Sequence, residues 1–156
     1  MEERAGLKIR LFGEPILRKR ALPVKEITQS QRDILSQMSR IMCESLGIGL
    51  AAPQVGINEA MIVVDIGSGL FKLINPKIIK KEGLEVMEEG CLSIPGVCIK
   101  VKRAKKVKIL AQDEFAKPLT LEAEDLLARV FQHEIDHLRG KLIDDYASFF
   151  DKLKMV

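Results

Sequence analysis

The chain contains two histidines, His133 and His137, and both lie in the hexapeptide QHEIDH. On an α-helix this four-residue spacing places the two imidazoles on one face, one turn apart. Glu134 lies between them in the sequence and is rotated to the side of that face. His-Glu-x-x-His on a helix is typical of metal-dependent hydrolases, in which the imidazoles hold the ion and the glutamate is a general base. We therefore predict that His133 and His137 are metal ligands and that Glu134 is the base.

Two imidazoles do not complete a metal site, so a third protein ligand is needed. In one large class it is a histidine six residues after the second histidine, but Ile143 occupies that position here. In another class it is a downstream glutamate, and no Glu follows His137. The third ligand is therefore an upstream residue or one of the downstream aspartates, Asp144, Asp145 and Asp151. The best upstream candidate is a cysteine, because thiolate is a strong ligand for zinc and iron.

Three cysteines are available upstream. Cys43 lies within an apolar helical stretch, and we expect it to belong to the core, because free cysteine packs as a small hydrophobic residue. Cys91 lies in EEGCLSIPG, with a glycine before it and a Pro-Gly bend after it, which suits a strand held close to another group. Cys98 reads as an ordinary strand residue. Local context therefore favours Cys91, with Cys98 as the alternative.

The segment GIGLAAPQVG, residues 47–56, is a second candidate for function. Glycines at positions 47 and 49 allow the backbone to approach a ligand closely, and Gln54 is the polar group of an otherwise apolar loop. A dinucleotide-binding reading of these glycines fails, because that fingerprint must follow a strand and open a helix. Here the segment follows a predicted helix, and Pro53 would break the next one early.

Two helices and several short strands must position these residues. Apolar residues at helical spacing predict a helix over about 30–46, with Gly47 as its C-terminal cap. A second helix over 124–140 carries the histidines. A buried strand over 60–66, a glycine turn and a return strand come between them, followed by short strand-like pieces up to about residue 122. The fold class is α+β, with mainly antiparallel β-sheets packed around the long helix of the His-Glu-x-x-His motif.

Length and composition predict one globular domain over residues 1–156, with 47% hydrophobic and 30% charged residues. No apolar run approaches the roughly 20 residues of a membrane span. The first residues lack the apolar region of a signal peptide, and three scattered cysteines make no disulfide framework, so we expect a reducing compartment. The net charge of +3 is too small to imply nucleic-acid binding. We interpret the basic run at 100–108 as solvated strand ends rather than a polyanion site.

Three motifs together make the chain resemble the peptide deformylases. The family carries G-x-G-L-A-A-P-Q-x-G, E-G-C-L-S and Q-H-E-x-D-H-L, and this chain reads GIGLAAPQVG, EGCLS and QHEIDHL in the same order. The early FGEPILR is similar to the family's N-terminal segment, so the resemblance covers roughly residues 8–147. It implies a hydrolase that removes the formyl group from the N-terminal N-formylmethionine of newly made polypeptides and releases formate. The alternative is a general metallopeptidase using the same metal-binding helix.

The resemblance also implies a role for individual residues. The metal ligands are Cys91, His133 and His137, and Glu134 is the general base and acid. Gln54 and the backbone N–H of Leu92 stabilise the oxyanion. Backbone groups of Ile48 and Gly49 hold the substrate as an added strand. In addition, we expect Leu126 and Val130, on the helix face before the first histidine, to line the methionine pocket.

Further expectations concern the ion, the surroundings of the site and the partners. The resemblance favours Fe(II), with Zn(II), Ni(II) or Co(II) as alternatives, and it implies a buried Glu89–Arg103 ion pair that supports the cysteine loop. Many relatives carry Arg where this chain has Cys98, and some have a long C-terminal helix for which the residues after Phe149 are too few.

We expect N-formylmethionyl nascent peptides as partners, at the ribosome surface near the peptide exit, without membrane or sequence-specific nucleic-acid binding. The location is cytoplasmic, or organellar where a transit segment has been removed.

Overall fold

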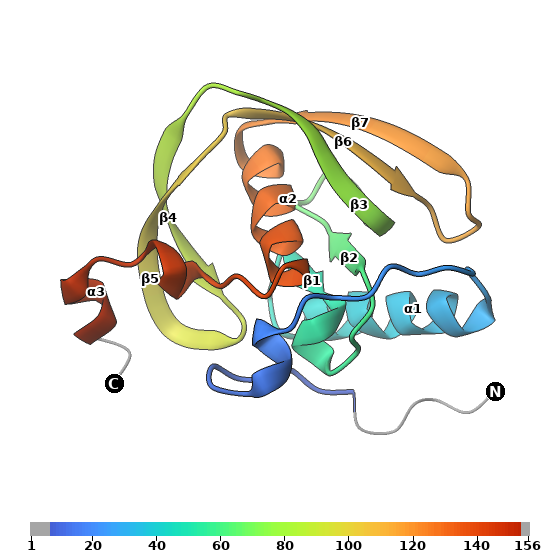
Figure 1. Cartoon of the computed structure of the whole chain (residues 1–156), viewed down its shortest axis with the longest axis horizontal. Helices are drawn as coiled ribbons and strands as arrows, with labels where there is room; N and C mark the ends of the chain where they lie inside the picture. Colours follow the sequence, from blue (N-terminus) through green and yellow to red (C-terminus); the bar gives the residue numbers. More distant parts are fainter. Residues whose placement is uncertain (1–6, 154–156) are drawn as a thin grey trace.

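Residues 7–153 are described in a computed structural model, which has two antiparallel sheets (Figure 1). The larger sheet has the order β1-β2-β3-β6-β7, with strands at Gly49–Ala51, Met61–Val64, Phe71–Glu82, Lys106–Gln112 and Pro118–Glu124. The smaller sheet is a hairpin of β4 (Glu85–Cys91) and β5 (Ile94–Arg103). The helices are α1 (Gln29–Glu44), α2 (Asp125–Leu138) and α3 (Phe149–Leu153), with 3-10 turns η1 (Pro15–Arg18), η2 (Ala52–Val55) and η3 (Ile143–Tyr146). The expected α+β class is confirmed.

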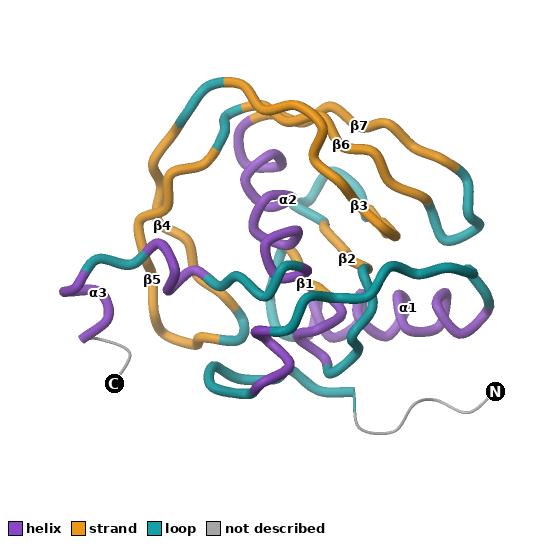
Figure 2. The backbone as a smooth tube through the Cα atoms, in the orientation of Figure 1, coloured by secondary structure: helices purple, strands orange, loops and turns teal. Residues whose placement is uncertain are grey.

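Helix α2 stands between the β4–β5 hairpin and the larger sheet (Figure 2). Its apolar residues Ala128, Phe131 and Ile135 are buried with those of the larger sheet in one core cluster. The opposite face carries the two histidines. Because α2 packs against β1, β2 and β7, the core holds the part of the helix from which the two histidines project.

Helix α1 begins and ends with recognisable caps. At its start, Thr28 and Gln31 form a capping box. At its end, Leu46 has the left-handed φ of 57°, and the N–H of Gly47 donates to the carbonyl of Met42 at 2.9 Å. This is the hydrogen-bond pattern of a Schellman ending. The predicted cap at Gly47 is therefore wrong by one residue, since Leu46 takes the left-handed position.

Cys43 is exposed, so the expectation that it belongs to the core is wrong. The buried face of α1 consists of Ile34, Leu35, Met38 and Met42. Cys43 follows the last of these by one residue, which rotates its side chain by about 100° from the apolar stripe. The apolar composition of the segment suggested that Cys43 is buried, but its position around the helix axis places it outside the buried face.

The predicted strands form largely where expected. β2 lies within the predicted strand at 60–66, and β3 pairs with it in antiparallel register after a glycine turn. In the basic run, Val101 and Val107 are buried while Lys100, Lys102 and Lys106 are exposed, which agrees with solvated strand ends. No helix within residues 7–153 is both long and apolar enough to cross a membrane.

Candidate active site

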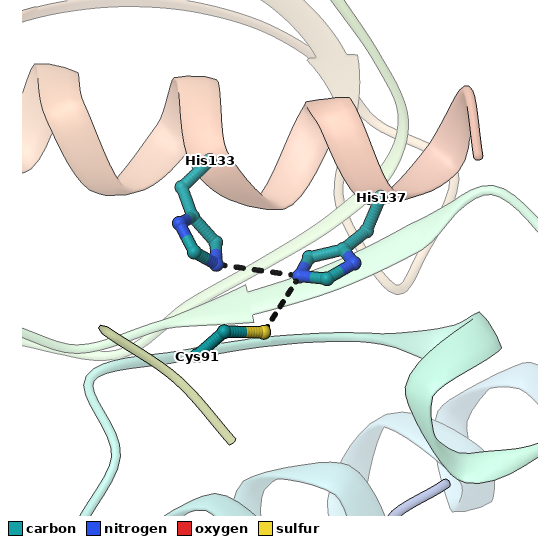
Figure 3. A group of neighbouring side chains, drawn as sticks. All are labelled: Cys91, His133 and His137. Carbon is teal, nitrogen blue, oxygen red and sulfur yellow. Dashed lines mark hydrogen bonds between the residues drawn. The ribbon is translucent and has the colours of Figure 1, made fainter. Parts of the chain in front are cut away.

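Cys91, His133 and His137 meet between two elements that are far apart in the sequence (Figure 3). The cysteine ends β4, and both histidines project from α2. The Nε2 atom of His137 lies 3.3 Å from Nε2 of His133 and 3.4 Å from Sγ of Cys91. All three potential ligand atoms lie within 4.8 Å of one another. A single ion could therefore be reached by two nitrogens and one sulfur.

The chemistry of this cluster fits a divalent transition metal. Two imidazoles and a thiolate are a donor set that zinc and iron(II) accept. Burial alone would lower the pKa of His133, but the charge of Glu134 and the hydrogen bonds with Cys91 and Glu89 outweigh it and raise this pKa to about 10. In the metal-free protein, the His133 ring therefore binds a proton at the site where the metal ion would otherwise bind. Burial keeps the pKa of His137 well below its ordinary value, so this ring stays neutral.

Glu134 lies beside the cluster without belonging to it. Its side chain is buried, and its Oε2 lies 4.0 Å from Nε2 of His133. Its Oε1 has no hydrogen-bond partner among the described residues. Burial raises the pKa of Glu134 to about 7. A carboxyl group with such a pKa can both accept and return a proton near neutral pH.

Gly49 leaves the space that Glu134 occupies. A Cβ at this position would lie 2.5 Å from Oε2 of Glu134 and 2.8 Å from Cγ1 of Val130. Only glycine therefore allows β1 to pass this close to α2. From the sequence, we expected a glycine here because the backbone must approach a ligand closely. The structure gives a second reason, which is the close approach of the Glu134 and Val130 side chains.

Gln54 is buried in η2 with its amide oriented by the backbone. Its Oε1 accepts the N–H of Ala51 at 2.9 Å. The amide nitrogen therefore points the other way, 3.1 Å from Oγ of Ser93 and 3.6 Å from Sγ of Cys91. Leu92 lies in the turn that follows Cys91. A donor is thus held at the edge of the metal-binding cluster.

Glu89 orients His133 through a buried hydrogen bond and is itself held by two arginines. Its Oε1 accepts from Nδ1 of His133 at 2.8 Å, which directs Nε2 of that ring towards the cluster. Arg103 binds both carboxylate oxygens, at 2.7 and 2.9 Å, and Arg129 binds Oε2 at 2.6 Å. Burial pushes the pKa of Glu89 up, but the hydrogen bonds from His133 and Arg103 outweigh it and lower the pKa to about 2. The expected Glu89–Arg103 ion pair is confirmed.

A groove of about 790 Å³ opens over the site. Its wall includes all four residues that we assigned to substrate binding, Ile48, Gly49, Leu126 and Val130. Cys91, His133 and Glu134 line the same groove. The site is therefore a pocket with a largely apolar wall and a smaller number of polar groups, which is the usual form of a small-ligand or peptide site.

Comparison with known proteins agrees with this geometry. The polypeptide deformylase family profile matches residues 7–152. The peptide deformylase of Halothermothrix orenii is 50% identical over 141 residues, which are 89% of this chain and 92% of that protein. The crystal structure of a peptide deformylase from Legionella pneumophila superposes with a TM-score of 0.93 at 39% identity, covering 97% of this chain and 91% of that one. A peptide deformylase from Synechococcus elongatus, solved with actinonin, has a TM-score of 0.93 at 41% identity, covering 99% and 87%.

The chain belongs to the peptide deformylase family. This family consists of metal-dependent hydrolases that remove the formyl group from new polypeptides. The general metallopeptidase that we held as the alternative is therefore not needed to explain the metal-binding helix of this deformylase.

The structure shows which of the candidate cysteines and aspartates lies beside the two histidines. Among the described residues only Cys91 joins the two histidines, while Cys98 is exposed on β5. Asp144 and Asp145 instead pair with Arg18, at 2.6 and 2.9 Å. Asp144, Asp145 and Cys98 therefore do not compete for the place beside the imidazoles.

Sequence reasoning missed part of the deformylase site. Arg129 is buried and donates to Glu89 and to two backbone carbonyls, and Asp136 and Tyr146 extend the network behind His133. One signal was available for Arg129, because it lies four residues before His133 and so on the same buried face of the predicted helix. A charge on that face indicates an internal partner. No local signal distinguished Tyr146.

Proposed function

We propose that this chain hydrolyses the formyl group of N-formylmethionyl nascent peptides at the site formed by β4, α2 and η2. One observation carries the proposal: the three potential ligand atoms of Cys91, His133 and His137 converge within 4.8 Å beside the buried carboxyl of Glu134. Three protein ligands and a separate proton carrier are typical of a catalytic metal site, because a structural site is closed by four protein ligands.

Cys91, His133 and His137 would hold one divalent ion. When bound, the ion supplies a Lewis acid that polarises the formyl carbonyl and acidifies water. We propose Fe(II), on the basis of the resemblance stated above, with Zn(II), Ni(II) or Co(II) as alternatives. The donor set supports an ion of this group without distinguishing its members.

The chain's own residues move protons and stabilise charge. Glu134 takes a proton from the attacking water and returns it to the departing amine, as its pKa near 7 allows. The amide nitrogen of Gln54 and the backbone N–H of Leu92 donate to the oxyanion that forms on the formyl oxygen. Removing one such donor typically slows an enzyme by roughly 10²–10³-fold.

The substrate peptide pairs with β1 through the backbone of Ile48 and Gly49. Support comes from the position of β1 at the edge of the larger sheet, where one side of the strand is not used by β2. Leu126 and Val130 form the wall that receives the methionine side chain. Formyl is the smallest acyl group, so a tight site at this point selects it over acetyl.

We test this function with two assays on the metal-loaded protein. The first follows formate release from a formyl-Met tripeptide, and the second follows internal cleavage of the same peptide without formyl. We expect formate release alone. Glu134→Gln should keep its metal and lose about 10²–10⁴-fold in rate, because the carboxylate moves protons and does not bind the ion. Glu44→Gln, an exposed position on α1, is the matched control and should keep full activity.

Two outcomes would contradict the proposal. Internal cleavage as fast as formate release would indicate a general metallopeptidase. Stoichiometric loss of metal from Glu134→Gln would place this carboxylate among the ligands.

We also propose where the reaction takes place. The substrate class is made on ribosomes, which supports a cytoplasmic enzyme that meets its substrates at the ribosome surface near the peptide exit. The family match over residues 7–152 supports a single catalytic domain in the chain. Co-sedimentation with ribosomes at low salt tests the encounter, and its absence would place deformylation after release from the ribosome surface.

A further inference from the structure

A tyrosine outside the proposed site is joined to it by side-chain hydrogen bonds. Tyr146 is the last residue of η3, the turn that follows α2. Its hydroxyl donates to Oδ2 of Asp136 at 2.6 Å. The same oxygen accepts from Nη1 of Arg103 at 2.7 Å. Because a carboxylate only accepts, the tyrosine hydroxyl and the guanidinium must both act as donors to Asp136.

The chain of contacts continues from Arg103 to a proposed metal ligand. Arg103 binds both oxygens of Glu89, at 2.7 and 2.9 Å, and Glu89 in turn accepts from Nδ1 of His133 at 2.8 Å. The side chains of Arg103 and Glu89 are only 4% and 6% exposed, and that of Asp136 is 13% exposed. Water therefore has little access to replace any link, so each link depends on the next one.

The ring of Tyr146 also contacts two cations. Nζ of Lys141 lies 4.3 Å from the ring centroid, and Cζ of Arg103 lies 4.9 Å from it. These distances are typical of cation–π contacts, which orient the ring and so aim its hydroxyl. Burial and the hydrogen bond to Asp136 raise the pKa of Tyr146, so the hydroxyl keeps its proton and remains a donor.

We infer that Tyr146 is a positioning residue for the metal ligand His133, acting through Asp136, Arg103 and Glu89. Its hydroxyl keeps Asp136 turned inwards, which gives Arg103 a second anchor. The guanidinium of Arg103 then binds Glu89 in one orientation, and Glu89 fixes the orientation of the His133 ring. The inference rests on the proposed function, since it assumes that His133 binds the ion.

Tyr146→Phe tests the inference, because it removes the hydroxyl and keeps the ring. The probe is Co(II) alone, with its affinity measured by chelator competition and its site observed by visible absorption. Direct outer partners of metal ligands change affinity by about 10–100-fold. Tyr146 lies farther from the ion, so we expect about 3–10-fold weaker Co(II) binding and a shifted absorption band, with a melting temperature close to that of the wild type. Asp136→Asn should reproduce the loss of affinity.

Two controls separate positioning from general loosening. Arg139→Met removes an exposed cation that follows α2 and is not part of the chain of contacts from Tyr146 to His133, so it should leave Co(II) affinity unchanged. In a Glu89→Gln background the link is already altered, so adding Tyr146→Phe should cause little further loss.

The inference is wrong if Tyr146→Phe binds Co(II) as the wild type does, or if its effect is equally large in the Glu89→Gln background. It is also wrong if Arg139→Met weakens binding as much as Tyr146→Phe. Failure of the wild-type protein to bind Co(II) or release formate would instead overturn the proposed function.

Discussion

Cys91 and Cys98 are seven residues apart on the same hairpin, yet the structure places them differently. Only Cys91 reaches the histidines. We predict that Cys91→Ser loses bound metal and activity, because a serine hydroxyl is a poor replacement for thiolate towards zinc or iron. Cys98→Ser and Cys43→Ser should keep bound metal at the wild-type level. Metal content after gel filtration checks this, and metal loss in Cys98→Ser would show that the other cysteine is the ligand.

Val130 is the second residue whose role can be tested singly. Val130→Phe should fill part of the groove wall opposite Gly49, and the larger ring should hinder a long substrate side chain more than a short one. We expect kcat/KM for formyl-Met peptides to fall at least about 10-fold more than for formyl-Ala peptides, given that one methylene in such a pocket is worth 10–200-fold. Equal losses for both substrates, with a lower melting temperature, would assign Val130 to the core alone.

At the scale of elements, Arg129 joins α2 to the β4–β5 hairpin. It donates to Glu89 at 2.6 Å and to the carbonyls of Val101 and Glu85 at 2.9 and 2.6 Å. Arg129→Met should lower the free energy of unfolding by about 3–5 kcal/mol, because it leaves buried partners without a donor. Arg139→Met, at the exposed end of α2, is the matched control and should change it by less than about 0.5 kcal/mol. Urea unfolding measures both, and equal effects would refute this role.

The Glu89 network also predicts how the metal-free protein responds to acid. The pKa of Glu89 is lowered from 4.5 to about 2, so its ionised form stabilises the fold above about pH 4.5. This stability is lost as the pH falls towards 2, because the unfolded chain binds the proton first. The unfolding free energies of wild type and Glu89→Gln should therefore differ most at pH 5–7 and converge near pH 2. A gap that stays constant from pH 7 to pH 3 would contradict the assignment.

At the scale of the whole molecule, the ion decides how the protein behaves in air. If the ion is Fe(II), activity should decay in air, because iron(II) beside a thiolate is oxidised and the cysteine can be oxidised in turn. Protein loaded with Ni(II) or Co(II) should keep its activity, and the zinc form should be stable but slower. Formate release by each form, prepared without oxygen and then exposed to air, measures this. Equal rates for the zinc and anaerobic iron forms, unaffected by air, would make the iron assignment wrong without affecting the family assignment.

The sequence predicted those features of the fold that depend on local pattern. The helix of QHEIDH, the apolar stripe of α1 and the β2–β3 turn all follow from short-range periodicity and glycine placement, and all formed. The errors at Cys43 and Gly47 came from helical phase and from the exact end of α1, which a difference of one residue changes. The roles assigned to Gln54, Leu92 and Ile48 stay predictions.

By itself, the sequence determined that the chemistry is metal-dependent hydrolysis. Two histidines four residues apart lie on one face of a helix, where both can bind one ion, and the glutamate between them can act as the base. It also narrowed the third ligand to a few residues. The resemblance to the deformylases then favoured Cys91. Only the tertiary structure shows how Cys91 comes to lie beside the histidines, since the meeting of Cys91 with α2 depends on how the β4–β5 hairpin packs against that helix. The same packing buries Glu89 between Arg103, Arg129 and His133, and it brings Tyr146 behind them. Contacts between residues so far apart in the chain are set by the packing of whole elements, which no local pattern encodes.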